Sequence, residues 1–268
     1  MKSEICLTFL GTSTSTGVPI IGCRCEVCTS DDPKLKRTRS SIHLQTPEYS
    51  ILVDTGPDLR EQALRENLTQ VDCVLYTHAH LDHITGFDEL RAFCWHRDAT
   101  LPLYGSPACL AEIKRIYQWA FLPTNNNRGY VRPEANETEG PFALGKLVIT
   151  PVPVEHGNID THGYRFDYPG VPSIAYLPDV KTIPPQSWHL LEDISVLIID
   201  CLHKRDHPTH MNLSESISTA TQLSAKHVYL THLSHELDVY QTLGELAEHF
   251  QFAYDGMKLT FPADASII

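Results

Sequence analysis

The segment Thr77-His78-Ala79-His80-Leu81-Asp82-His83 constrains this chain more than any other. It follows the apolar run 71–76, whose β-branched character predicts a buried strand, and it precedes a segment that looks helical. Imidazole and carboxylate groups together suit zinc, manganese or iron. A single histidine on a turn is usually a solvated surface residue, but His78, His80, Asp82 and His83 crowded after one buried strand predict a metal site.

Three further residues occupy similar positions. His156, Asp179 and His232 each come just after an apolar run that predicts a strand. Taken alone, each is equally well explained as a polar residue that caps a turn. The same placement recurs at four predicted strand ends, and loops at strand ends gather at one rim of a sheet. The recurrence therefore predicts one common site.

The alternation of strand and helix signals predicts layers of both. With 268 residues, 42% hydrophobic and 20% charged, the chain is long enough and ordinary enough in composition for a globular core. The predicted strands are 5–10, 41–45, 50–54, 71–76, 146–152, 163–168, 173–177, 195–201 and 227–231. The predicted helices are 57–67, 88–96, 107–119, 213–223 and 240–250. Two similar halves with outer helices favour an α/β fold, arranged as a layered αββα sandwich.

Residues 122–141 contain three consecutive asparagines, two glycines and few apolar side chains. We predict a long loop or lid here, because long loops are often functional. Residues 1–268 show no internal repeat and no low-complexity linker, so we expect a single domain.

The formal net charge of −12 argues against a nucleic-acid partner, since such proteins concentrate Lys and Arg to neutralise phosphates. A small phosphorylated substrate remains compatible, because bound metals supply local positive charge. No apolar run reaches the roughly 20 residues that span a bilayer. The N-terminus enters a strand-like run without a signal-peptide pattern, so we expect a cytoplasmic protein whose eight cysteines are thiols or metal ligands.

The seven candidate ligands together resemble the ligand set of the metallo-β-lactamase superfamily, in the family's order and with no member missing. That resemblance implies a four-layer αββα sandwich with two metals at its edge. It also implies that His78, His80 and His156 hold one metal, that Asp82, His83 and His232 hold the other, and that Asp179 bridges them.

A second motif narrows the resemblance to the PhnP-like phosphodiesterases. The loop 22–28 has the spacing C-x-C-x₂-C, with Cys23, Cys25 and Cys28, and His235 follows near the other end of the chain. In that branch the matching residues hold a structural zinc, and a closed Cys₃His site is a standard zinc geometry. Three buried or redox-active thiols are the alternative. Such a zinc would pin the N-terminal loop to the loop that carries His232.

The resemblance implies a dinuclear-metal-dependent hydrolase that acts through a metal-bridging hydroxide. The expected substrate is a small phosphodiester, such as a cyclic ribosyl or nucleotide phosphate. The expected cofactors are two divalent metals in the active site, zinc or manganese with iron as a further candidate, and one structural zinc. His210 matches the family's proposed general acid, although it is also explained as a polar residue before the helix at 213. Asp82 is expected to be both a metal ligand and a catalytic residue. The resemblance also suggests a homodimer.

Other functions share the same motif. An RNA-processing endonuclease of the tRNA 3′-end type and a thioester or lactone hydrolase are open alternatives. A diiron oxidoreductase is disfavoured, because that group has an acid where this chain has His80. Asp54 and Thr77 are candidates to orient the ligands, with a turn role for Asp54 equally open. The further candidates for phosphate contact, for which solvated surface charge is the default, are Arg91, His96, Lys204 and Arg205.

Overall fold

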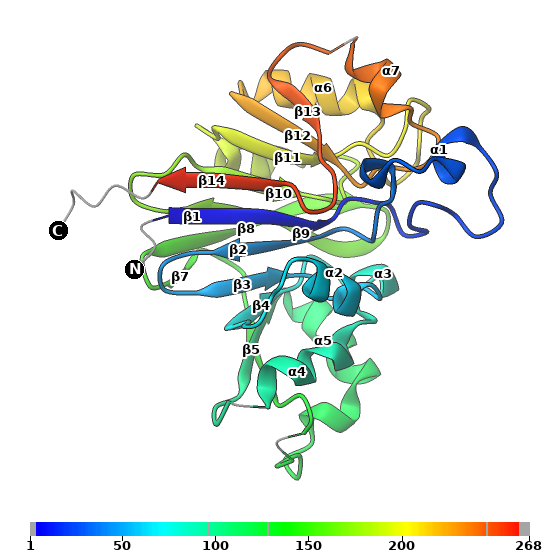
Figure 1. The fold of residues 1–268 in the computed structure, drawn as a ribbon. Coiled ribbons are helices and arrows are strands. Elements are labelled where there is room, and N and C mark those ends of the chain that lie inside the picture. The colour runs from blue at the N-terminus through cyan, green and yellow to red at the C-terminus, as the bar shows by residue number, and fades with distance from the viewer. Residues whose placement is uncertain (1–3, 96, 128, 245, 263–268) are drawn as a thin grey trace.

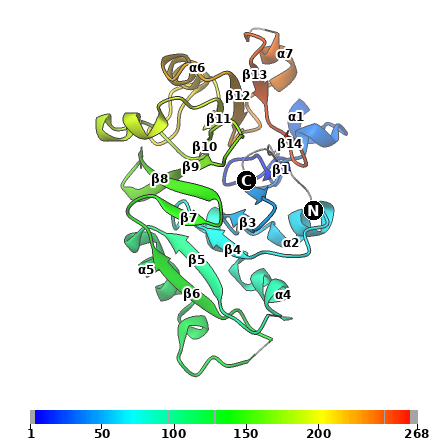
Figure 2. The same cartoon turned by 90° about the vertical axis from the view of Figure 1, so that its left-hand side faces the viewer.

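The computed structural model describes residues 4–95, 97–127, 129–244 and 246–262. Two seven-stranded sheets lie face to face, with helices outside both (Figures 1 and 2). The strand order is β14-β1-β2-β3-β4-β5-β6 in the first sheet and β13-β12-β11-β10-β9-β8-β7 in the second. The predicted αββα sandwich is therefore confirmed.

The first sheet is formed by β1 (Glu4–Gly11), β2 (Ser41–Gln45), β3 (Ser50–Val53), β4 (Cys73–Leu75), β5 (Leu101–Gly105), β6 (Pro133–Glu137) and β14 (Lys258–Pro262). The second is formed by β7 (Phe142–Leu144), β8 (Leu147–His156), β9 (Ile159–Asp167), β10 (Ile174–Leu177), β11 (Val196–Asp200), β12 (His227–Thr231) and β13 (Phe250–Phe252). The α-helices are α1 (Glu26–Thr29), α2 (Leu59–Arg65), α3 (Leu81–Ile84), α4 (Arg91–Cys94), α5 (Pro107–Ile116), α6 (Leu213–Gln222) and α7 (Val239–Leu243). The 3₁₀ helices are η1 (Pro33–Leu35), η2 (Phe87–Leu90), η3 (Gln118–Phe121) and η4 (Pro185–Leu191).

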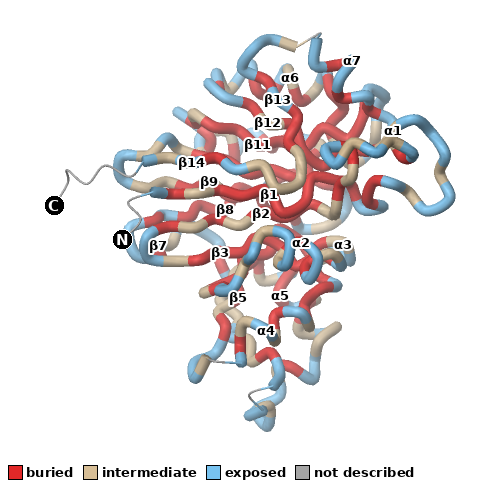
Figure 3. Tube along the Cα trace, in the orientation of Figure 1, coloured by how far each residue is buried: buried red, intermediate tan, exposed pale blue. Residues whose placement is uncertain are grey.

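Three apolar layers hold the sandwich together, because successive residues of a strand point to opposite faces of its sheet. In β4, Cys73 and Leu75 pack between the two sheets, whereas Val74 packs under the helices of the first sheet. In β11, Ile198 faces the space between the sheets and Leu197 faces the outer helices of the second. Figure 3 shows the same pattern as buried sheets inside a more exposed periphery.

The parallel parts of both sheets bring strand ends to one edge. Strands β3 to β6 pair in parallel in the first sheet, and β10 to β13 do so in the second. Their carboxyl ends therefore point the same way within each sheet. Helices α1 and α3 lie at this edge, on the right of Figure 1.

Several predicted elements differ from the structure. The segment 122–141 is not all loop, because β6 pairs in parallel with β5 and forms the end of the first sheet. The predicted helix 240–250 is wrong beyond Leu243, since Phe250 already belongs to β13 and pairs with β12. The predicted helix 88–96 is η2 followed by α4, and His96 lies outside the described residues. Strands β5, β7, β13 and β14 were not predicted.

No helix among the described residues is long and apolar enough to cross a membrane.

Candidate metal centre

The turn between β4 and α3 carries four of the predicted ligands. His80 precedes the first residue of α3, and its Nδ1 lies 2.8 Å from Nε2 of His78. Within α3, the Nε2 atom of His83 lies 3.3 Å from Oδ2 of Asp82. His78 and His83 are buried, Asp82 is half-buried and His80 is exposed. The motif therefore presents donor atoms at the sandwich edge that range from buried to solvent-exposed.

The second sheet supplies three more donors from three separate strand ends. His156 ends β8, and its Nε2 lies 3.3 Å from Nδ1 of His80. Asp179 follows β10, with Oδ2 3.3 Å from Nε2 of His83. His232 follows β12, with Nε2 3.1 Å from Oδ1 of Asp179. The structure thus brings all seven predicted residues together.

The donor atoms form overlapping triads. Within each triad the ligand atoms lie within 4.8 Å of one another, a spacing compatible with shared ions; three of these triads are His78–His80–His156, His78–His83–Asp179 and Asp82–His83–His232. We call the seven residues the His/Asp cluster.

Buried atoms without partners show that the His/Asp cluster fits metal ions. Nε2 of His83, Nε2 of His232 and Oδ2 of Asp179 have no hydrogen-bond partner among the described residues. Buried polar atoms are nearly always satisfied, and an ion is one of the standard explanations when they are not. The three atoms belong to the same cluster, and nitrogen and carboxylate oxygen donors suit zinc, manganese or iron.

The electrostatics of the cluster are those of histidines and carboxylates removed from water. Burial, reinforced by neighbouring His83, holds the pKa of His78 well below its usual value. Burial also lowers the pKa of His232, to about 3. For Asp179, burial opposes ionisation, but His232 and His83 outweigh it and lower its pKa well below the usual range. The pKa of His83 moves the other way: burial opposes its protonation, but Asp179, Asp82 and Asp54 outweigh burial and raise its pKa well above the usual value. Low pKa values at His78, His232 and Asp179 favour neutral imidazoles beside an ionised carboxylate, the forms that bind a cation.

A second layer of groups orients these side chains. Oδ2 of Asp54 accepts hydrogen bonds from His83 Nδ1 and Thr77 Oγ1, each 2.8 Å away. Nδ1 of His78 lies 3.0 Å from the same Thr77 hydroxyl, and Nδ1 of His156 lies 2.8 Å from the Thr209 carbonyl. Asp54 and Thr77 therefore lie where the sequence suggested. Such partners fix the ring orientation of a ligating histidine.

Two residues of this region adopt left-handed backbone conformations that side chains rarely take. Asp54 has φ of 65° and His232 has φ of 56°. Backbone strain of this kind is held in place only when the surroundings determine it, and it gathers at functional sites. Both residues direct a polar side chain into the same buried edge.

Asp200 was missed by the sequence reasoning. It ends β11 and is fully buried, and its Oδ2 lies 2.7 Å from Nδ1 of His210. Burial raises the pKa of the Asp200 carboxyl group to about 7. Burial of His210 would lower the pKa of its imidazole, but the neighbouring Asp200 has the larger effect and raises it. The sequence does contain the relevant pattern, because Asp200 directly follows an apolar run, much as Asp179 and His232 follow theirs. Asp200 falls inside the predicted strand 195–201, so the pattern assigns it to the strand.

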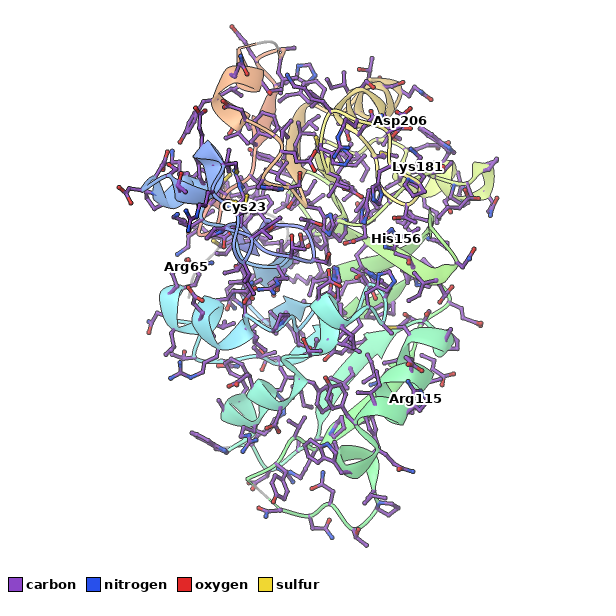
Figure 4. The ribbon with its side chains drawn as sticks, turned by 90° about the vertical axis from the view of Figure 1, so that its right-hand side faces the viewer. Cys23, Arg65, Arg115, His156, Lys181 and Asp206 are labelled. Carbon is purple, nitrogen blue, oxygen red and sulfur yellow. The ribbon has the colours of Figure 1, made fainter. Side chains whose placement is uncertain are left out.

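Cys23, Cys25, Cys28 and His235 also meet. Nδ1 of His235 lies 3.3, 3.4 and 3.5 Å from the sulfurs of Cys23, Cys25 and Cys28. We call these four residues the Cys₃His cluster. The hydrogen bond from the Cys28 backbone N–H lowers the pKa of Cys25 to about 6, and that sulfur caps α1. Figure 4 looks onto the sandwich edge and shows Cys23 to one side of His156.

The N-terminal loop is joined to the His232 loop by hydrogen bonds as well. The Leu233 N–H donates to the Thr12 carbonyl at 2.9 Å, and Ser13 forms a bridge to Leu233. A zinc ion is therefore not the only possible connection between the two loops.

Three of the four candidate phosphate contacts lie in the described part of the chain, and two of them are engaged in ion pairs. The guanidinium of Arg205 pairs with Glu236 and is 70% exposed. Arg91 pairs with Asp88 in the helices that follow α3, and Lys204 is exposed.

A family profile described as a β-lactamase superfamily domain matches residues 49–233. Together with the two-sheet sandwich and the cluster at its edge, the match shows that the chain belongs to the metallo-β-lactamase superfamily. This fold typically binds divalent metals, in agreement with the donor set described above.

The most informative solved structure is described as a new diphosphatase from the PhnP family. It is 39% identical, has a TM-score of 0.88, and the match covers 96% of this chain and 97% of that one. Within the superfamily, the chain is therefore a PhnP-like hydrolase. A zinc-bound PqqB from Methylobacterium extorquens, 19% identical with a TM-score of 0.79, covers 95% of this chain and 99% of its own, and shares the fold.

Curated relatives are longer. An octanoyltransferase from Porphyromonas gingivalis is 35% identical over 254 residues, which are 93% of this chain and 50% of that protein. The chain thus spans about half the length of that relative.

Proposed function

We propose that the chain is a dinuclear-metal-dependent hydrolase that cleaves a P–O bond of a small phosphorylated molecule. The first candidate is a phosphodiester, such as a cyclic ribosyl or nucleotide phosphate. The observation that supports this most is the His/Asp cluster, in which seven donors from distant segments meet around buried unpartnered atoms.

In this proposal His78, His80 and His156 hold one ion and Asp82, His83 and His232 hold the other. Asp179 would serve both ions; in support, its Oδ1 lies 3.1 Å from His232 Nε2 and 3.9 Å from His156 Nε2. A pair of bound divalent cations would activate water and neutralise charge on a phosphoryl group. Zinc and manganese are the first candidates, with iron as a further one.

His210 is proposed to give a proton to the leaving oxygen. Its ring centroid lies 4.5 Å from that of His156 and 4.6 Å from that of His232. Nδ1 is engaged by Asp200, which leaves Nε2 as the nitrogen that faces a substrate. Because Asp200 raises the pKa of His210, the imidazole keeps its proton to a higher pH than a free histidine does, which favours the role of a general acid.

The Cys₃His cluster is proposed to hold a structural zinc. Three sulfurs and one ring nitrogen make a closed tetrahedral donor set with no position left for substrate. The cluster lies between the N-terminal loop and the loop after β12, so its role would be to fix two loops.

A diphosphate is the second candidate substrate, favoured by the relative described as a diphosphatase. Both substrates present phosphoryl oxygens, and the same donors and the same proton donor serve either leaving group. The net charge of −12 disfavours an RNA substrate.

Elemental analysis combined with turnover tests the proposal. We expect about three metals per chain, at least one of them zinc, and turnover of bis(p-nitrophenyl) phosphate or ADP that a chelator abolishes. His78→Ala should abolish this turnover, and Asp31→Asn, which changes an exposed carboxylate, should not. One metal or none in protein purified without chelator, or chelator-resistant turnover, would contradict it.

A further inference from the structure

A pocket beside the ligand-bearing turn takes no part in the function proposed above. Its volume is about 650 Å³, within the roughly 300–1,000 Å³ typical of small-molecule sites. We call it the aromatic pocket, because Tyr117, Trp119 and Tyr130 are among the residues that line it, together with Arg91, Asn125 and four others. The five named residues come from α4, the end of α5, η3 and the segment before β6.

The aromatic rings are held in fixed positions. Tyr117 stacks on Phe87, with ring centroids 4.3 Å apart and 13° between the planes. Trp119 stands edge-on to Phe87 at 6.4 Å and contacts Tyr130 at 5.8 Å and 70°. Trp119 is nevertheless 40% exposed and Tyr130 45% exposed. The pocket thus offers large, rigid aromatic surfaces to an incoming ligand.

One wall of the pocket contacts α3, the helix that carries Asp82 and His83. The Tyr117 hydroxyl donates a 2.8 Å hydrogen bond to the carbonyl of Ile84, the residue after His83. Phe87, which supports both Tyr117 and Trp119, begins η2 just beyond α3. In Figure 1 the green segment after α5 lies below α3 on the same side of the molecule. Tyr117, which lines the pocket, thus contacts the element that carries Asp82 and His83.

The polar groups of the pocket fit a flat neutral heterocycle better than a phosphate. Arg91 is paired with Asp88, so the pocket has little net positive charge to hold an anion. A paired guanidinium still presents a planar face for stacking. The Asn125 amide N–H groups are used by the carbonyls of Ala120 and Val131, at 2.7 and 2.8 Å, which fixes its side chain and leaves its oxygen as an acceptor.

We propose that the aromatic pocket binds the nucleobase of a small nucleotide whose phosphate is held at the metal centre; the second half of this statement rests on the proposed function. Bases stack on aromatic side chains and on arginine planes in many proteins, largely independently of sequence. The chain's acidity and the pairing of Arg91 restrict the partner to a mononucleotide, since a polymer needs a run of free cations.

Calorimetric titration of the metal-loaded protein with AMP and with ribose 5-phosphate tests the pocket without requiring turnover. The two probes share the phosphate and the sugar and differ in the base. We expect AMP to bind at least about tenfold more tightly, which corresponds to roughly one stacked base. Trp119→Leu should reduce AMP binding to the level of ribose 5-phosphate and leave ribose 5-phosphate unchanged.

Trp95→Leu is the matched control. Trp95 is 54% exposed and lines the neighbouring groove between α2 and α4, so its loss should leave AMP binding unchanged. If Trp119→Leu lowers the unfolding temperature, Tyr130→Leu provides a second truncation in the same pocket.

Equal affinity for the two probes, or an equal effect of Trp95→Leu and Trp119→Leu, would overturn the proposal. The proposed function fails separately: a chain that hydrolyses no phosphate ester or anhydride but binds AMP through Trp119 keeps the pocket and loses the chemistry. Chelator-sensitive hydrolysis with no preference for a base would support the proposed function and contradict the base-binding role of the aromatic pocket.

Discussion

The His/Asp cluster and the Cys₃His cluster are both sets of metal-binding side chains, yet the chain builds them differently. The first draws its donors from the ends of four strands in two sheets, and apart from His80 and Asp82 they are buried. The second takes three donors from one short loop and a fourth from a loop after β12, and Cys25 is exposed.

The groups behind the donors differ as well. Asp54, Thr77 and the Thr209 carbonyl hold the second nitrogens of His83, His78 and His156. Around the cysteines the supporting bonds are backbone N–H groups, from Cys28 to Cys25 and from Ile20 to Cys28. The first cluster therefore rests on strand ends and on buried side-chain partners, whereas the second rests on two loops and a few backbone hydrogen bonds. Loss of a donor should cost chemistry in the first and stability in the second.

Asp179→Asn should have the largest effect, because it removes the carboxylate placed between both proposed ions. We expect kcat to fall by at least about 10³-fold, equivalent to several kcal/mol of transition-state stabilisation. The amide keeps the shape of the side chain, so circular dichroism should be unchanged. Steady-state kinetics on the best phosphate substrate measures the effect. A loss of kcat below tenfold would contradict the expectation that a donor of the His/Asp cluster is needed for the chemistry.

Asp200→Asn should rank second and tests the link to His210. Burial opposes protonation of His210, but Asp200 outweighs it and raises the pKa. Without that charge the pKa falls, so His210 loses its proton at lower pH. We expect kcat to fall by about 10²-fold, as for loss of a general acid, and the alkaline limb of the pH–rate profile to shift to lower pH. An unshifted alkaline limb would remove His210 from the proposed role.

Asp54→Asn should act on metal affinity more than on proton transfer. Loss of a group that orients a ligating histidine typically costs about 10–100-fold in affinity or activity. Added metal should therefore restore much of the activity, which it should not do for Asp200→Asn. Titration of the metal-depleted variants with zinc or manganese separates the two.

Much of the His/Asp cluster was predictable, because its members follow apolar runs that the chain must bury as strands. His156, Asp179 and His232 could be found by that rule without any knowledge of their contacts. Asp200 obeys the same rule but is the last residue of its strand, so it was counted as strand rather than as site.

The failures concern segments whose structure depends on distant partners. Residues 133–137 have little strand character, and they form β6 because β5 offers an unpaired edge. Phe250–Phe252 likewise becomes a strand by pairing with β12. The aromatic pocket could not be predicted from the sequence, because Arg91, Trp119 and Tyr130 come together only in the folded chain.

Cys25→Ser should have the smallest effect on activity and sharpens the contrast between the clusters. We expect one zinc fewer per chain and a lower unfolding temperature, by roughly 5 °C for about 2 kcal/mol. Activity should fall less than about tenfold, because the Leu233–Thr12 hydrogen bond still joins the two loops. Cys6→Ser, outside both clusters, is the control and should leave zinc content unchanged. If Cys25→Ser abolished turnover as completely as Asp179→Asn, the two clusters would act as a single unit, and the loop hydrogen bonds alone could not hold His232 in place.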